Sequence, residues 1–330
     1  MRVESGTVRK PLKFDGNCMA MGTRPKIFID GEHGTTGLQI RSMLAGREDL
    51  EVISVPVERR RDIEARAEFL NAADLAILCL PDDAARESVS LIANDTTRVV
   101  DASTAHRVAE GWAYGFPELD KEQGGRIAGA TRVANPGCWP QGPIATLRPL
   151  IAAGLLPADY PVTMNGISGY SGGGKSMIED YVAKGEDAPE YLPYGLTLQH
   201  KHVPELKKYA GLSHDPLMQP VVGNFAQGMV TMVPLQLGAL PRVPTGAELH
   251  AAIADHYAGI KDRAVEVAPL AATERTPELD PERYNGTNRM KLHVFANDRR
   301  AQAVLVAVYD NLGKGASGAA VQNMDLMLEL

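Results

Sequence analysis

The chain has 330 residues, of which 44% are hydrophobic, so it can bury the core of one large domain or of two medium ones. Its formal net charge of -7 excludes a general electrostatic attraction to nucleic acids or anionic membranes, and we expect neither as a partner. We expect a soluble, cytoplasmic protein for three reasons. The three cysteines have no paired spacing, no stretch approaches the roughly 18 apolar residues of a membrane span, and the N-terminus shows no secretory signal.

The first strong pattern follows residues 1–24, which show no usable periodicity and predict a loose N-terminal extension. Residues 27–29 predict a short buried strand, and the glycine turn of residues 31–37 leads into a helix that ends near Ala45. Such a turn lets backbone N–H groups approach a pyrophosphate at the helix N-terminus. The spacing is G-x-x-G-x-x-G rather than G-x-G-x-x-G, so a plain strand-to-helix turn stays open as an alternative.

Strands and helices then alternate as in a parallel, doubly wound sheet. The predicted strands are 52–57, 75–80 and 99–100, and the predicted helices are 63–71 and 82–94. After the second strand, where an NAD enzyme offers a carboxylate to the ribose, Glu58 is followed by Arg59, Arg60 and Arg61. The arginines favour the 2′-phosphate of NADP, and the alternative is a solvated start to the next helix.

A cysteine follows a Pro-Gly turn after the predicted strand 132–135 and precedes a predicted helix, 141–153. A thiol in the first turn of a helix meets unpaired N–H groups and the positive end of the helix dipole, which favour the thiolate. Cys138 is therefore the candidate nucleophile. The alternative is a small buried side chain, because free cysteine is among the residues most often buried.

The composition changes after this helix. Strands are predicted at 162–168, 229–237, 289–295 and 303–309, with few helices between them, and an apolar helix closes the chain near Leu328. Long strands with few helices indicate an α+β domain with a mixed or antiparallel sheet.

One motif favours a different class of protein. Residues 169–176 fit the P-loop pattern G-x-x-x-x-G-K-[ST] and follow a strand, and Asp310 at the end of an apolar strand could hold magnesium. A P-loop normally opens its domain, however, whereas here a complete α/β unit precedes it. The same glycines can bring backbone amides close to the phosphate of a cofactor or substrate without ATP.

Two histidines, His200 and His202, stand two residues apart and share a face in an extended segment. Glu205 could fix the tautomer of one ring. A zinc site would need more ligands nearby, and His214 and His293 are too isolated, so we expect no metal. The alternative is a surface loop in which neither histidine has a catalytic role. A thiol at a helix start together with a histidine on another element indicates a nucleophile and its acid-base partner.

Together these segments resemble the N-acetyl-γ-glutamyl-phosphate reductases. The resembling segments, in family order, are 31–37, 101–107, 135–138, 168–172, 200–205 and 311–316. The opening residues 29–32 and the modest length resemble the shorter of the two family types. The cysteine of the sister aspartate-semialdehyde dehydrogenases normally follows Asn directly, so Pro136 and Gly137 favour the glutamyl enzyme. Aspartyl and carrier-linked aminoadipyl substrates, a P-loop NTPase and a dinucleotide sensor without catalysis stay open.

The resemblance implies an α/β plus α+β architecture. A Rossmann-type NADP-binding domain would comprise residues 25–136 with 312–330, so that the C-terminal helix returns to it. Residues 137–311 would form the catalytic and dimerisation domain of a homo-oligomer, a dimer or tetramer.

The resemblance also implies the chemistry, which belongs to arginine biosynthesis. The Cys138 thiolate would attack the acyl phosphate and release inorganic phosphate, and NADPH would reduce the thioester to N-acetylglutamate semialdehyde. His202 would move the proton and titrate between about pH 6 and 8, as an unperturbed imidazole does, with His200 as a substrate-side neighbour and Glu205 in the same catalytic group. Arg107 and Asn135 would bind the substrate. The implied cofactor-binding residues are Gly31, Gly34, Thr35, Thr36, Gly37, Arg59, Arg60, Ser103, Gly172, Gly173 and Asn311.

Overall fold

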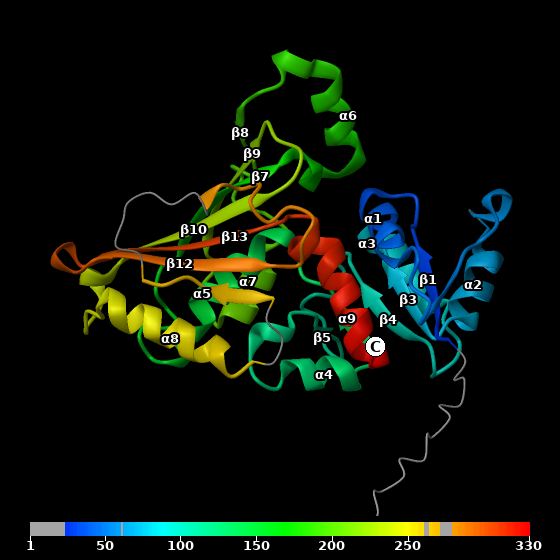
Figure 1. Cartoon of the computed structure of the whole chain (residues 1–330), viewed down its shortest axis with the longest axis horizontal. Coiled ribbons are helices and arrows are strands. Elements are labelled where there is room, and N and C mark those ends of the chain that lie inside the picture. Colours follow the sequence, from blue (N-terminus) through cyan, green and yellow to red (C-terminus); the bar gives the residue numbers. More distant parts are fainter. Residues whose placement is uncertain (1–23, 61, 261–263, 271–278) are drawn as a thin grey trace, which may run out of the picture.

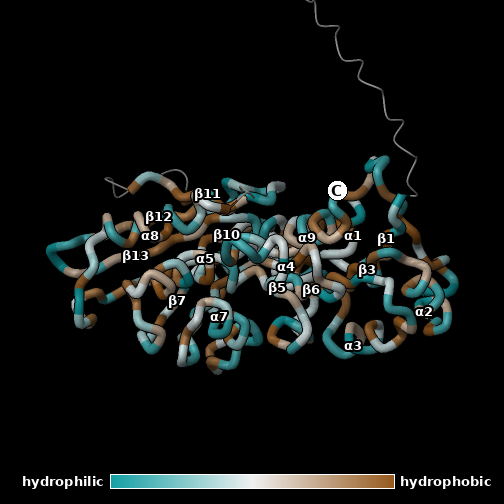
Figure 2. The backbone as a smooth tube through the Cα atoms, turned by 90° about the horizontal axis from the view of Figure 1, so that it is seen from below, coloured by the Kyte–Doolittle hydropathy of each residue, from teal (hydrophilic) through white to brown (hydrophobic). Residues whose placement is uncertain are grey.

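The computed structural model describes residues 24–60, 62–260, 264–270 and 279–330, which form two lobes side by side, each around its own sheet (Figure 1). The expected N-terminal extension, apart from Arg24, and Arg61 of the arginine run lie outside the described residues. Figure 2 views the molecule from below and shows α4 and α9 at the junction of the lobes. In the described part of the chain, no helix is long and apolar enough to cross a membrane.

The first lobe is a six-stranded parallel sheet with the order β2-β1-β3-β4-β6-β5. Its strands are β1 (Lys26–Asp30), β2 (Glu51–Ile53), β3 (Leu75–Leu78), β4 (Arg98–Asp101), β5 (Ala113–Tyr114) and β6 (Arg132–Ala134). Consecutive residues of β1 and β3 pack alternately into two hydrophobic clusters, one on each face, so the sheet is buried on both sides. The predicted doubly wound sheet is confirmed.

Helices cover both faces of this sheet. α2 (Ile63–Ala72) and α3 (Asp82–Ser90) contribute to one cluster, and α1 (Thr35–Leu44) and α4 (Gln123–Gly129) to the other. The second strand is shorter than predicted, because Pro56 has no N–H for a sheet ladder and Val57–Arg59 form a 3-10 turn.

The C-terminal helix α9 (Gly318–Leu328), red in Figure 1, packs on the first lobe although it follows the last strand of the second. Its Ala320, Met324 and Met327 lie in the same cluster as residues of β1, β3 and α1. This confirms the expected return of the C-terminal helix to the first sheet.

The second lobe is a seven-stranded mixed sheet with the order β11-β12-β13-β10-β7-β9-β8. Its strands are β7 (Thr163–Gly169), β8 (Tyr191–Pro193), β9 (Leu217–Gly223), β10 (Met229–Gln236), β11 (Val265–Val267), β12 (Met290–Asn297) and β13 (Gln302–Tyr309). The β7-β9 and β11-β12 pairs are parallel, and the other neighbours are antiparallel. The predicted mixed sheet is confirmed, although the sequence pattern did not predict β8, β9 or β11.

One large hydrophobic cluster joins this sheet to α5 (Cys138–Ala152), α7 (Val203–Ala210) and α8 (Gly246–Ala258). A further helix, α6 (Gly174–Lys184), stands beyond the β8 edge of the sheet in Figure 1. The start of α5 and the start of α7 thereby meet at the junction of the two lobes, where the candidate site lies.

Candidate active site

Cys138 is the first residue of α5, three residues earlier than the predicted helix start. The helix begins there because Gly137 precedes it with extended backbone angles and β6 ends just before this turn. A Cβ added to Gly137 would lie 2.5 Å from the Arg107 guanidinium and 2.7 Å from Nε2 of His202, so any other residue here would displace one of these two side chains. The turn therefore places the thiol beside an arginine and a histidine from two other segments.

The environment of the thiol differs from the prediction that the helix start favours a thiolate. Burial raises the pKa of Cys138, although the Arg107 guanidinium, the backbone N–H of Trp139 and the Lys201 ammonium act in the opposite direction. Because burial outweighs these groups, the thiol needs a base to become a nucleophile.

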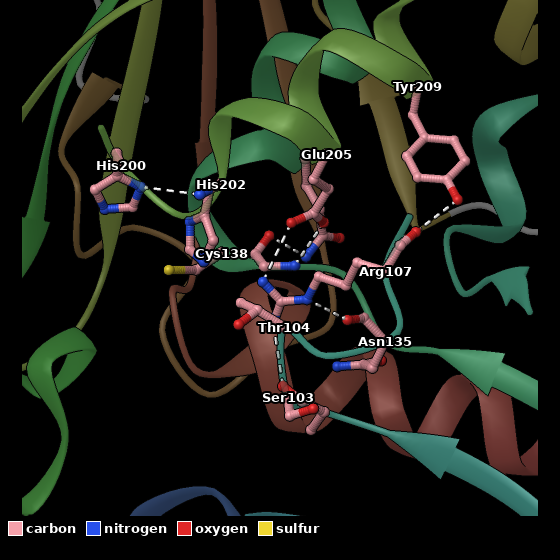
Figure 3. Close-up of polar contacts among 12 residues, drawn as sticks. Ser103, Thr104, Arg107, Asn135, Cys138, His200, His202, Glu205 and Tyr209 are labelled. Carbon is pink, nitrogen blue, oxygen red and sulfur yellow. Dashed lines mark hydrogen bonds and ion pairs between the residues drawn. The ribbon is translucent and has the colours of Figure 1, made fainter. Parts of the chain in front are cut away.

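His202 lies just before α7 and is 6% exposed, and Figure 3 shows its ring next to Cys138. Burial, with Arg107 and His200 adding to it, lowers the pKa of His202 well below 6.5, which does not agree with the expected titration between about pH 6 and 8. Its Nδ1 is buried without a hydrogen-bond partner among the described residues. A neutral imidazole with one nitrogen beside the cysteine turn can accept a proton.

His200 supports this histidine from the cavity side. The backbone N–H of His202 donates to Nδ1 of His200 at 3.2 Å, and the two rings meet edge to face at 4.8 Å. Burial lowers the pKa of His200 to about 4, so both rings are neutral at neutral pH.

Glu205 does not fix a histidine tautomer, contrary to the prediction. Its Oε1 accepts from the Tyr114 hydroxyl at 2.7 Å and from the Gly137 N–H at 2.8 Å, and its Oε2 accepts from Arg107 at 3.1 Å. Three donors converge on this buried carboxylate, so it clamps the cysteine turn instead (Figure 3). No sequence pattern indicated Tyr114, because β5 has only two residues and is too short to show a period.

Arg107 crosses from the end of the first sheet to this turn, and it is 7% exposed. Its guanidinium donates to the carbonyls of Asn135 at 3.0 Å and Ala102 at 3.1 Å, besides Glu205. The Asn135 side chain is buried and turned elsewhere, because it donates to the Ala316 carbonyl at 2.9 Å and accepts from Asn323 at 3.0 Å. Asn135 thus braces the cysteine turn, which does not agree with its predicted contact to substrate.

A cavity of about 250 Å³ opens on the thiol. Its lining residues include Cys138, Ser168, Gly172, Gly173, Tyr194, His200, Lys201 and His202. The two predicted glycines are therefore at the site, whereas Asn311 is buried and holds the neighbouring turn by donating to Ser171 at 3.0 Å and accepting from the Gly228 N–H. Tyr194 and Lys201 are additions that the sequence did not indicate.

A second cavity, of about 540 Å³, lies at the carboxyl end of β1 and is lined by Gly31, Gly34, Arg60 and Arg66, among others. Gly31 has φ +90, and a Cβ there would collide with the Cys79 carbonyl, so the close turn requires glycine. Gly37 packs equally closely on the Gly31 carbonyl. This glycine cradle fits the pyrophosphate of a dinucleotide.

The first turn of α1 begins at Thr35 and Thr36 and carries no side-chain cap, which leaves backbone N–H donors for phosphate. Arg60 lines the cavity and pairs with no carboxylate among the described residues, so it fits a 2′-phosphate. Arg59 is not among the residues that line this cavity and pairs with Asp62 at 3.1 Å and Glu68 at 3.6 Å, so this geometry does not support its predicted cofactor contact.

Ser103 closes the turn after β4. Its hydroxyl donates to Asp101 at 2.7 Å, and its N–H donates to the same carboxylate at 2.9 Å. His106, stacked on Trp112, also meets Asp101, with 2.6 Å between Nδ1 and Oδ2. Ser103 therefore shapes the loop that carries Arg107.

The P-loop interpretation fails on the geometry of its two key residues. Lys175 is an exposed residue of α6 whose ammonium lies 3.7 Å from Glu179. Asp310 is buried and accepts from Gln227, from the Gly286 N–H at 2.8 Å and from the Leu312 N–H at 2.9 Å. In the described segments, no group of three or more His, Cys, Asp or Glu side chains could hold a metal ion.

Comparison with known families shows two matches that together follow both lobes. Residues 57–126 match the family "Semialdehyde dehydrogenase, NAD binding domain", and residues 138–311 match "Semialdehyde dehydrogenase, dimerisation domain". Similar solved structures include aspartate semialdehyde dehydrogenase II from Vibrio cholerae, with a TM-score of 0.68, 17% identity and coverage of 93% and 99% of the two chains. The enzyme of Candida albicans, solved with NADP, has a TM-score of 0.65 at 14% identity, over 93% and 99%. These structures share the fold.

Sequence relatives are much more similar. An N-acetyl-γ-glutamyl-phosphate reductase of Mesorhizobium japonicum is 80% identical over 93% of this chain and 100% of its own. Its counterpart in Chelativorans is also 80% identical, over 92% and 98%, and that of Brucella ovis is 56% identical, over 92% and 99%.

Proposed function

Because the chain belongs to the N-acetyl-γ-glutamyl-phosphate reductases of the semialdehyde dehydrogenase family, we propose that Cys138 is its covalent catalyst. The protein is an NADP-dependent oxidoreductase of arginine biosynthesis that reduces N-acetyl-γ-glutamyl phosphate to the semialdehyde and releases inorganic phosphate. The observation that best supports this proposal is that the thiol of Cys138, at the first residue of a helix, lines the same cavity as His200 and His202. The same membership sets aside the aspartyl and aminoadipyl substrates, the P-loop NTPase and the dinucleotide sensor.

His202 activates the thiol. Burial keeps both Cys138 and His202 uncharged, so the thiol proton passes to the imidazole as the sulfur attacks the acyl carbon. The bond from that carbon to the phosphate oxygen then breaks, and His202 gives the proton to the departing phosphate. A thioester remains on Cys138.

The cavity beside Gly31 would hold NADPH, and the chemistry this cofactor would supply is a hydride for the reduction of the thioester. Collapse of the resulting thiohemiacetal frees the semialdehyde and restores the Cys138 sulfur, which takes up one proton from solvent through His202. Gly172 and Gly173 bring backbone close to the reacting groups in the thiol cavity. In the cofactor cavity, Arg60 would hold the 2′-phosphate of the cofactor.

Cations around the thiol suit an anionic substrate. The Arg107 guanidinium lies against Gly137, and Lys201 lines the cavity, and both lower the pKa of Cys138 against the effect of burial. We assign the substrate phosphate to Arg107, with Lys201 at the mouth and His200 on the substrate side.

The proposed division of labour follows the lobes. Residues 25–136 with 312–330 would hold the cofactor, and residues 137–311 would carry catalysis and self-association. Exposed apolar side chains gather on α6 and around β8, with Val182 69%, Tyr191 63% and Leu196 71% exposed. A second copy of the chain covering this patch would give a homodimer or tetramer, which light scattering after gel filtration measures. We place the enzyme in the cytoplasm, where its free thiols stay reduced.

The nucleophile is tested by Cys138→Ser, with Cys18→Ser as the matched control. A serine hydroxyl is scarcely ionised at neutral pH, so phosphate-dependent NADP reduction by N-acetylglutamate semialdehyde should disappear while NADPH binding persists. Retention of more than a few per cent of the activity would refute the covalent route. Running the assay with aspartate and aminoadipate semialdehydes tests the acyl chain.

A further inference from the structure

A fully buried ion pair, which the mechanism does not use, lies behind the catalytic cysteine. Lys314 and Glu118 have side chains with 0% exposure, and Nζ of Lys314 lies 2.7 Å and 2.8 Å from the two carboxylate oxygens. Its third donor goes to Oε1 of Gln322 at 2.8 Å, so all three N–H groups of the ammonium are used. The pair joins the 3-10 turn Pro117–Leu119 to the segment before α9.

Stability alone is a weak reason for such a pair. Removing two charges from water is costly, and replacing a buried ion pair by apolar residues of similar size is often neutral or stabilising. Breaking the pair on one side is harmful, because it leaves an unpaired buried charge. The pair is better explained by what its geometry holds in place.

Lys314 belongs to a π-helical turn, Gly313–Ser317, that packs directly on the cysteine. A Cβ added to Gly315 would lie 2.9 Å from Cβ of Cys138, so the two backbones are in close contact. The Lys314 carbonyl accepts from Gln141 at 2.8 Å, three residues after the cysteine. The Ala316 carbonyl accepts from Asn135 at 2.9 Å, three residues before it. The π-turn is thus hydrogen-bonded to the chain both before and after Cys138.

We propose that Lys314 and Glu118 are positioning residues, which lock the π-turn against the start of α5 and so fix where the Cys138 sulfur stands in the cavity. Isolated π-turns are frequent at functional sites, and their irregular backbone needs side-chain support. This support comes from the bond between the Lys314 ammonium and Glu118. Glu118 also accepts from the side-chain amide of Gln322 on α9 at 3.0 Å. The returning C-terminal helix is thereby linked to the cysteine turn through Gln322, in addition to the hydrogen bond from Asn323 to Asn135.

The test uses the double variant Lys314→Met/Glu118→Leu, which removes both charges together and so leaves no unpaired buried charge, although Gln322 loses its hydrogen bonds to both side chains. We expect folded protein with a Tm near that of the wild type, and a rate of Cys138 alkylation by iodoacetamide at neutral pH that falls about ten- to a hundredfold. The kcat should fall in step while KM for the semialdehyde stays within about threefold, because the reacting atom is displaced rather than the binding groups.

The matched control is Arg47→Met/Asp325→Leu, which removes an ion pair, 2.6 Å between Nη1 and Oδ1, that joins α9 to the loop after α1 rather than to the turn of Glu118. Its alkylation rate should equal that of the wild type. If the double variant does not fold, Glu118→Gln decides, because its amide oxygen still accepts from Lys314, while the negative charge and one of the two accepting oxygens are lost. An alkylation rate within about twofold of the wild type in the folded variant overturns the proposal, as does failure of both variants to fold.

This inference rests on Cys138 as the nucleophile, but the two can fail separately. Iodoacetamide reports the thiol itself, so a slower alkylation supports positioning by Lys314 even if Cys138→Ser proves active. If Cys138→Ser loses turnover but the double variant is alkylated at the wild-type rate, the covalent mechanism is supported and the positioning role of Lys314 and Glu118 is refuted.

Discussion

The clamp on the cysteine turn is most sharply tested by Glu205→Gln, a nearly isosteric change. All three partners of this carboxylate are donors, namely the Tyr114 hydroxyl, the Gly137 N–H and the Arg107 guanidinium. A carboxylate accepts at both oxygens, whereas an amide offers one oxygen and one NH2 group that repels a donor. The substitution must therefore leave at least one buried partner unsatisfied, whichever way the amide turns.

The size of the effect follows from the burial of the pair. Arg107 and Glu205 have side chains that are 8% and 2% exposed, and breaking a buried pair by removing one partner costs about 3–5 kcal/mol. At about 2–4 °C for each kcal/mol, Tm should fall by roughly 6–20 °C. The kcat should fall as well, because Gly137 and Arg107 hold the thiol in its cavity.

Differential scanning fluorimetry and steady-state kinetics measure both effects. Glu122→Gln is the control, because Glu122 is 86% exposed, its pair with Arg126 spans 3.3 Å, and such surface pairs contribute about 0–1 kcal/mol. If Glu205 fixed a histidine tautomer instead, Tm would hold and only the pH profile of kcat would change. A Tm for Glu205→Gln within about 2 °C of the wild type would refute the clamp.

Three further outcomes are expected. His202→Asn should lower kcat by about 10²–10⁴, and because burial keeps the pKa of His202 well below 6.5, an inflection of wild-type kcat near pH 6.5 that vanishes in the variant would contradict the structure. Wild-type Tm should fall as the pH drops below about 6.5, because both histidines bind protons in the unfolded chain at that pH but stay neutral in the folded protein. Burial lowers the folded pKa of His200 to about 4 and that of His202 well below 6.5. His200→Asn/His202→Asn should lose less Tm over this range, and an equal loss would place the acid sensitivity elsewhere. Arg60→Ala should raise KM for NADPH about tenfold more than for NADH, whereas Arg59→Ala should change neither, and equal effects of Arg60→Ala on both cofactors would make Arg60 a surface charge.

Local patterns were enough to predict the elements that carry the chemistry. The apolar run of β3, the glycine turn between β1 and α1, and the Pro-Gly turn before Cys138 each express a constraint among residues close in sequence. Burial periodicity and backbone freedom at glycine act over a few residues, so the sequence shows them directly. The same holds for the linear segments that resemble the reductase family.

The partners of the site residues were decided by tertiary structure. Glu205 lies 68 residues from Gly137 and 98 from Arg107, and Lys314 lies 196 residues from Glu118, so no local pattern could pair them. Arg59 and Arg60 are neighbours with equal charge, yet only Arg60 reaches the cofactor cavity. The pKa values of Cys138 and His202 moved away from the sequence expectation for the same reason. The loss of water around a titratable group depends on all the elements that pack against it, and these come together only in the folded chain.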